Sequence, residues 1–231
     1  MPPSGMRFKA KTMKSTHPTT PGIAVREPFN TYSHAVGVVL GLAGMVVLLF
    51  FAQGNPAKVA GALVFGLSMI LMYTSSALYH ALQVSEQALL WLRKLDHAAI
   101  FLFIAGTYTP VLLQAMEPSW RPWALGLVWG LAVLGIGLKL VTLKAPRWLY
   151  TATYLGMGWL AVFFLPKLAL NPWALGFLIA GGLAYSLGAV VYAAKWPNLL
   201  PERIGFHGIW HVFVLLGSLG MYFAVLALYL N

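Results

Sequence analysis

The chain has 231 residues, of which 60% are hydrophobic and only 9% are charged. This composition excludes an ordinary soluble globular domain and indicates an integral membrane protein. The chain has no cysteine, which excludes disulfides and thiolate chemistry and leaves nitrogen and oxygen ligands for any metal.

The N-terminal segment, residues 1–26, carries basic residues and no acidic residue. Its prolines and its lack of an apolar stretch predict a basic, disordered cytoplasmic tail rather than a secretory signal peptide. Such a tail either stays solvated or contacts anionic lipid headgroups. Residues 27–231 are expected to form a single membrane domain.

Seven apolar runs follow, each long enough to cross a bilayer core of about 30 Å. Backbone groups in lipid must be satisfied within the segment, and the runs lack the alternation of a transmembrane β-strand. We therefore expect an all-α bundle of seven transmembrane helices. The runs lie at about 32–53, 58–80, 95–116, 122–141, 148–166, 173–194 and 207–230.

Positive charges separate by loop and predict the orientation of the bundle. Of the fifteen Lys and Arg residues, twelve lie in the tail or in the loops after the second, fourth and sixth runs, and three flank the other loops. The positive-inside rule then places the N-terminus in the cytoplasm and the C-terminus outside. Because the net charge of +10 is distributed in this way, it argues against a nucleic acid partner.

Five of the six histidines fall at the predicted cytoplasmic ends of the runs, namely His34, His80, His97, His207 and His211. His207 and His211 are four residues apart and share a helix face. Asp96 is the one carboxylate inside an apolar run, and an ionisable group at membrane depth is a functional candidate.

These positions predict a metal site. His80, His207 and His211 can bind Zn²⁺ through three imidazoles and leave a fourth position for water, which is the pattern of a catalytic zinc. Asp96 is then the candidate general base. Ser76, one turn before His80, can hydrogen-bond Asp96, a ligand or a substrate oxygen.

Glu27, Asn30 and His34 share one helix face at the start of the first run, and we expect them around the ligands. His97 follows Asp96 directly and points about 100° away around the helix, so it is left out of the metal shell. Two other interpretations stay open. The histidines can be interfacial residues with wet tips, and Asp96 can be an ion-pair partner or a helix cap.

Four motifs in this order resemble the hemolysin III family, the bacterial branch of the progestin and adipoQ receptor group, which is related to the adiponectin receptors and the alkaline ceramidases. They are E-P-F-N-x-x-x-H at 27–34, S-x-x-x-H at 76–80, Asp96, and P-E-R-x-x-F-H-x-x-x-H at 201–211. The resemblance covers the chain after residue 26 and implies a seven-helix protein of the bacterial inner (plasma) membrane. It also implies zinc near the cytoplasmic side, bound by His80, His207 and His211, with Asp96 and Ser76 close to the metal-bound water.

Three functions fit these features. The first is a zinc-dependent hydrolase of a membrane lipid amide or ester, which the relation to ceramidases favours by analogy. The second is a pore-forming, cytolytic protein, which would have to form an oligomer because the polar residues gather at one end of the bundle. The third is a receptor-like regulator of membrane lipid homeostasis with a structural zinc. We favour the first, with a membrane lipid as substrate or ligand.

Overall fold

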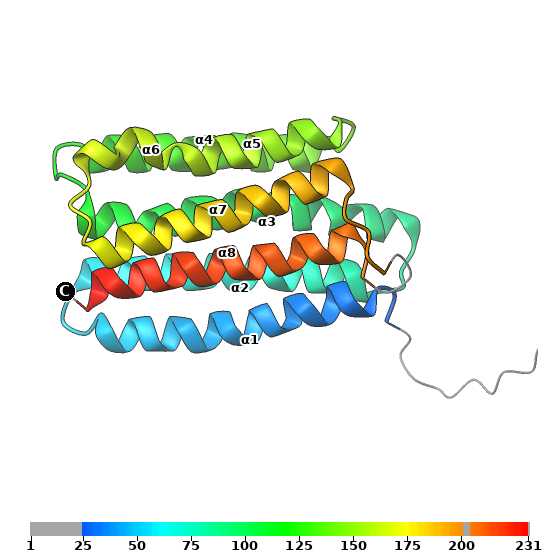
Figure 1. Cartoon of the computed structure of the whole chain (residues 1–231), viewed down its shortest axis with the longest axis horizontal. Coiled ribbons are helices and arrows are strands. Elements are labelled where there is room, and N and C mark those ends of the chain that lie inside the picture. The colour runs from blue at the N-terminus through cyan, green and yellow to red at the C-terminus, as the bar shows by residue number, and fades with distance from the viewer. Residues whose placement is uncertain (1–24, 201–203, 231) are drawn as a thin grey trace, which may run out of the picture.

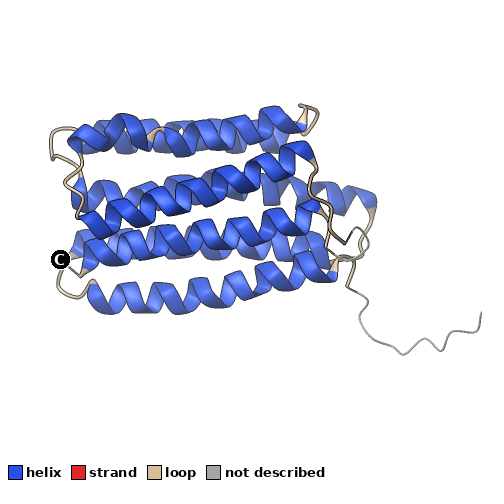
Figure 2. Ribbon diagram, in the orientation of Figure 1, coloured by secondary structure: helices blue, strands red, loops and turns tan. Residues whose placement is uncertain are grey.

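The computed structural model describes residues 25–200 and 204–230, and these residues form helices and no strand (Figure 2). The helices are α1 (Pro28–Phe51), α2 (Pro56–Ala81), α3 (Glu86–Ala115), α4 (Arg121–Val141), α5 (Arg147–Trp159), α6 (Ala161–Phe164), the 3-10 turn η1 (Leu165–Lys167), α7 (Pro172–Ala194) and α8 (Phe206–Tyr229). They give seven segments long and apolar enough to cross a membrane, of which α5, α6 and η1 form the fifth. The predicted seven-helix bundle is therefore confirmed. The predicted tail lies outside the described residues, apart from Val25 and Arg26.

Capping side chains determine where several helices begin. The side chains of Asn55, Ser85 and Asn171 accept backbone N–H bonds in the first turns of α2, α3 and α7, which satisfies donors that a helix start leaves free. The third helix therefore starts at Glu86, well before the apolar run expected from about 95. Hydropathy alone does not detect residues 86–94, because this first part of α3 precedes the apolar stretch.

The fifth membrane segment is interrupted, which the single run predicted over 148–166 did not anticipate. α5 ends at Trp159, and the short helix α6 begins at Ala161. The Tyr108 hydroxyl of α3 donates to the backbone oxygens of Met157 and Gly158, at 3.0 and 2.6 Å. A neighbouring helix thus satisfies carbonyl groups at the break, as membrane depth requires.

The arrangement of the helices brings the start of α1, the end of α2 and the starts of α3 and α8 to one end of the bundle (right-hand end in Figure 1). α2 packs between α1 and α3, α8 packs on α7 and α1, and α3 also contacts α4 and α5. Of the seven segments, α3 is the most enclosed, with 61% of its apolar window buried, against 17% for the fifth segment. The bundle is therefore built around α3, and the fifth segment is the least enclosed.

Candidate metal centre

Three histidine side chains meet at this end of the bundle. His80 comes from the last turn of α2, and His207 and His211 come from the first turns of α8. Their ligand atoms all lie within 4.8 Å of one another, and the Nε2 atoms of His80 and His207 are 3.3 Å apart. Two nitrogens bound at 2.0–2.1 Å to one tetrahedral ion would be about 3.3 Å apart. The cluster therefore has the donor chemistry and the spacing to hold a metal ion.

A carboxylate orients the His80 ring. Its Nδ1 lies 2.8 Å from Oε2 of Glu27, and this hydrogen bond lowers the pKa of Glu27 to about 2, so the carboxylate is ionised at neutral pH. Glu27 is fixed in turn, because the backbone N–H groups of Arg26 and Glu27 bond to the carbonyl oxygens of Ala81 and His80. With Nδ1 occupied, Nε2 is the atom of His80 free to bind a metal.

The start of α1 orients the His211 ring in a similar way. The Nδ1 atom of His211 lies 3.2 Å from the backbone oxygen of Asn30 and 3.2 Å from the Ser33 hydroxyl, which leaves its Nε2 free. Close contact between α1 and α8 depends on Gly208, between the two histidines, because a Cβ there would lie 2.8 Å from the Phe29 ring. The Asn30 amide also donates to the carboxylate that holds His80. One turn of α1 therefore supports two of the three imidazoles.

His34 lies against the cluster but is not part of it. Its ring stacks on the His211 ring, with centroids 3.6 Å apart and planes 11° apart, and its edge faces Tyr73. His34 is only 3% exposed, and neither ring nitrogen has a hydrogen-bond partner in the described part of the chain. It limits the rotation of the His211 ring by packing.

Asp96 and Ser76 lie on the wall of a cavity that also reaches His207 and His211. The Asp96 carboxylate interacts with the Ser76 side chain. Within the described residues no direct ion pair joins Asp96 to a basic residue, although the charge of Arg93 acts on Asp96 at longer range. His97 turns toward α5, where its Nδ1 lies 3.3 Å from the Tyr154 hydroxyl, in line with its expected exclusion from the metal shell.

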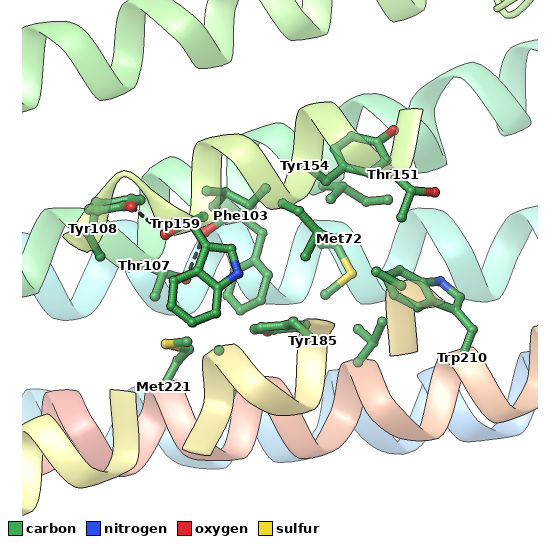
Figure 3. A pocket seen from close by; sticks show the side chains of 18 of the residues that line it. Met72, Phe103, Thr107, Tyr108, Thr151, Tyr154, Trp159, Tyr185, Trp210 and Met221 are labelled. Carbon is green, nitrogen blue, oxygen red and sulfur yellow. Dashed lines mark hydrogen bonds between the residues drawn. The ribbon is translucent and has the colours of Figure 1, made fainter. Parts of the chain in front are cut away.

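The cavity has a volume of about 470 Å³ and extends from the histidines far into the bundle. Along α3 its wall runs from Arg93 to Leu112, which is roughly 28 Å of helix at about 1.5 Å per residue. Beyond the histidine end the lining is largely apolar or aromatic (Figure 3) and includes Met72, Phe103, Trp159, Tyr185 and Met221. The site is therefore connected to a long space suited to an apolar chain.

Two arginines also line the histidine end of the cavity, Arg93 of α3 and Arg147 at the start of α5, with Tyr192 of α7. Sequence reasoning used Arg147 only to predict orientation, considered Arg93 also as an ion-pair partner of Asp96, and did not consider Tyr192. The signal that could have found Arg147 is its place at the predicted cytoplasmic end of an apolar run, where the histidines also fall. Residues 201–203, which open the last predicted motif, lie outside the described residues.

The seven apolar helices define a multi-pass membrane protein, and its largely buried cluster of three imidazoles could hold a metal ion. The family model described as "Haemolysin-III related" matches residues 23–222. The chain belongs to this family.

Relatives of known description agree with this assignment. The chain is 38% identical over 202 residues to the "Hemolysin-3 homolog" of Bacillus subtilis (strain 168), covering 85% of this chain and 91% of that protein. It is 37% identical over 202 residues to "Hemolysin-3" of Bacillus cereus, covering 85% and 89%. A more distant match, 33% over 158 residues, is "Heptahelical transmembrane protein 5" of Arabidopsis thaliana, covering 60% and 41%. With seven apolar helices and bacterial relatives, the chain is a multi-pass protein of the bacterial plasma membrane.

Proposed function

We propose that the protein is a zinc-dependent hydrolase that cleaves an amide or ester bond in a membrane lipid. The observation that carries the proposal is the histidine cluster, two members of which, His207 and His211, lie with Asp96 on the wall of a long apolar cavity. Three imidazole ligands suit zinc, and three protein ligands leave a position open. A bound zinc ion supplies Lewis acidity, which makes water a usable nucleophile near neutral pH.

The side chains around the cluster have separate roles in this proposal. Asp96 takes a proton from the attacking water and returns it to the departing amine or alkoxide, so it acts as general base and then as general acid. Ser76 orients the Asp96 carboxylate. Glu27 and Asn30 hold the imidazoles through their Nδ1 atoms, and His34 packs against the ring of His211.

The apolar part of the cavity fits an acyl chain. An extended chain advances about 1.3 Å per carbon, given C–C bonds of about 1.5 Å, so a chain of about 16 carbons occupies most of the cavity length. Each buried methylene contributes about 0.8 kcal/mol. Binding of the chain therefore supplies the energy that positions the scissile bond beside the histidines.

A lipid can reach the cavity from the side of the bundle. Trp159, Val162 and Ile179 line the cavity and are 43%, 47% and 51% exposed. These residues belong to α5, α6 and α7, so the cavity wall meets the lipid-facing surface between these helices. The Trp159 indole donates to the Ser186 hydroxyl of α7 at 3.0 Å, which bridges the same gap.

The test compares metal content with turnover in detergent-purified protein. We expect about one zinc per chain and release of fatty acid from at least one member of a panel of lipid amides and esters. Asp96→Asn should keep the zinc and lower the rate by about 10²–10⁴-fold, since it removes proton transfer alone. His80→Ala and His211→Ala should lose both zinc and turnover, whereas His17→Ala should lose neither.

Two results would count against the hydrolase. Folded protein without zinc after zinc is supplied would contradict the metal site. Zinc-loaded protein that turns over nothing in the panel would favour a structural ion in a receptor-like regulator instead.

The names of the bacterial relatives raise a second candidate, membrane lysis through a pore. The apolar lining of the cavity does not favour water or ions along a single bundle, so a pore would have to form between several chains. Conductance across planar bilayers that survives His80→Ala would support this candidate and would separate it from metal-dependent chemistry.

A further inference from the structure

We propose that the histidine end of the cavity contains an anion-binding site, formed by Arg147 with Arg93, and that the bound lipid carries an anionic group close to its acyl linkage. The proposal deepens the proposed function, on which it rests for the place of the acyl linkage. Its central observation is the buried Nη1 atom of Arg147, which has no hydrogen-bond partner among the described residues.

Arg147 lines the cavity and is partly buried at the start of α5. Its Nη1 atom is buried and has no hydrogen-bond partner in residues 25–200 and 204–230, and Arg147 forms no ion pair there. By contrast, Arg26 at the same end is paired with Glu27 at 2.9 Å. A buried charged donor without a partner costs free energy, which an anionic ligand would recover.

Aromatic side chains hold the guanidinium in place. The Arg147 Cζ atom lies 4.8 Å from the ring centroid of Tyr192 and 5.2 Å from that of Phe206. Guanidinium groups stack favourably on such rings, and stacking leaves the N–H donors at the edge of the plane available. A carboxylate or phosphate can then accept two parallel hydrogen bonds from that edge.

The position of Arg147 relates the anion to the candidate metal centre. Tyr192 contacts both groups, because its ring centroid also lies 5.5 Å from that of His207. Arg93 approaches the same end from α3, one turn before Asp96, and lines the cavity as well. An anion bound by Arg147 is separated from His207 by the Tyr192 ring. It therefore belongs to the head of the lipid rather than to its chain.

This spacing defines the chemical class of the lipid. It is a single-chain amphiphile with an oxyanion a few atoms from the acyl bond, either the carboxylate of an N-acyl amino acid or the phosphate of a lysophospholipid. Both offer the same chemistry to the arginines. Neutral lipid amides and esters lack it.

The test measures binding of matched lipids to the full-length protein in neutral detergent by calorimetry. The first pair is N-palmitoylglycine and N-palmitoylethanolamine, which share the chain and the amide and differ in charge. The second pair is 1-palmitoyl-glycerol-3-phosphate and 1-palmitoylglycerol. We expect the anionic member of at least one pair to bind on the order of tenfold more tightly, and the pair that differs identifies carboxylate or phosphate as the group recognised.

Arg147→Gln should remove this preference, and Arg147→Lys, which keeps the charge but loses the planar fork, should retain part of it. Lys144→Gln is the matched control, because it removes a charge from an exposed residue in the same loop region without touching the cavity. Equal affinities within both pairs, failure of all four lipids to bind, or a preference that survives Arg147→Gln would overturn the site. If Arg147→Gln does not fold, the affinities for anionic and neutral lipids are compared in Arg147→Lys and Arg93→Gln instead.

The measurement is made with a chelator present, so it requires neither metal nor turnover. An anion preference without hydrolysis in the metal-loaded protein would therefore contradict the hydrolase and leave the anion site standing. Hydrolysis of neutral lipids alone, with no preference for anionic lipids in binding, would contradict the anion site and leave the hydrolase standing.

Discussion

At the scale of single residues, the candidate metal centre depends on contacts made outside the ligands themselves. Glu27 and Asn30 come from the start of α1, yet they occupy the Nδ1 atoms of histidines on α2 and α8. Each contact fixes which ring nitrogen faces the cluster and limits rotation of the ring. The affinity for metal should therefore depend on the first turn of α1, although that turn supplies no ligand.

Glu27→Gln tests this dependence directly. The substitution keeps the size of the side chain but removes the negative charge of the carboxylate that accepts the hydrogen bond from His80. Zinc affinity should therefore fall by about 10–100-fold. Competition with a chelator of known affinity measures the change. Glu86→Gln is the control, since it removes an exposed carboxylate from the first turn of α3. Equal zinc affinity in the two variants would mean that the Glu27 contact has no effect on the metal.

Sequence reasoning went further with the ligands than with the cavity around them. The i, i+4 spacing of His207 and His211 and the place of His80 at the end of a run are local signals, and the structure brings these three side chains together. Arg147 and Tyr192 meet only because α5 packs beside α7. No periodicity along the chain reports such a contact, since it depends on which helices become neighbours.

At the scale of elements, small residues allow the tight contact between α7 and α8. A Cβ on Gly220 would lie 2.7 Å from the Cα of Gly181, 2.9 Å from its nitrogen and 3.1 Å from the oxygen of Phe177. These are backbone atoms, which cannot turn aside as a side chain can. Membrane helices use small residues in this way, because close packing has to replace the hydrophobic effect between them.

Gly220→Ala should therefore lower the thermal midpoint of the purified protein, with a loss of about 1–3 kcal/mol from overpacking. Gly176→Ala, at a position with no heavy atom within 4 Å of the new Cβ, should leave the midpoint unchanged or raise it slightly, because alanine is the better helix former. Size-exclusion chromatography with thermal ramping measures both variants. Equal midpoints would show that the helices can separate at no cost.

The boundaries of the elements were predicted where they coincide with a change in hydropathy and missed where they do not. Six of the runs correspond to single helices, because an apolar run in lipid has no alternative to helix. The interruption between Trp159 and Ala161 was missed, since both flanks are apolar. It is accommodated by the Tyr108 hydroxyl from α3, a contact between distant parts of the chain.

At the scale of the whole molecule, the candidate metal centre, the anion site and the concentration of positive charge lie at one end of the bundle. The charge distribution predicts that this end faces the cytoplasm. The polar head of a bound lipid would then lie at the inner leaflet, with its chain directed toward the membrane centre.

The absence of cysteine makes this orientation simple to test, because a single introduced cysteine is the only thiol. Ser119 precedes α4 and Lys144 follows it, and both are exposed, so they lie on opposite sides of the membrane. On intact cells a membrane-impermeant maleimide should label Ser119→Cys and spare Lys144→Cys, and permeabilised cells should label both. The reverse pattern would place the histidines and Arg147 at the outer face, where the lipid would have to come from the outer leaflet.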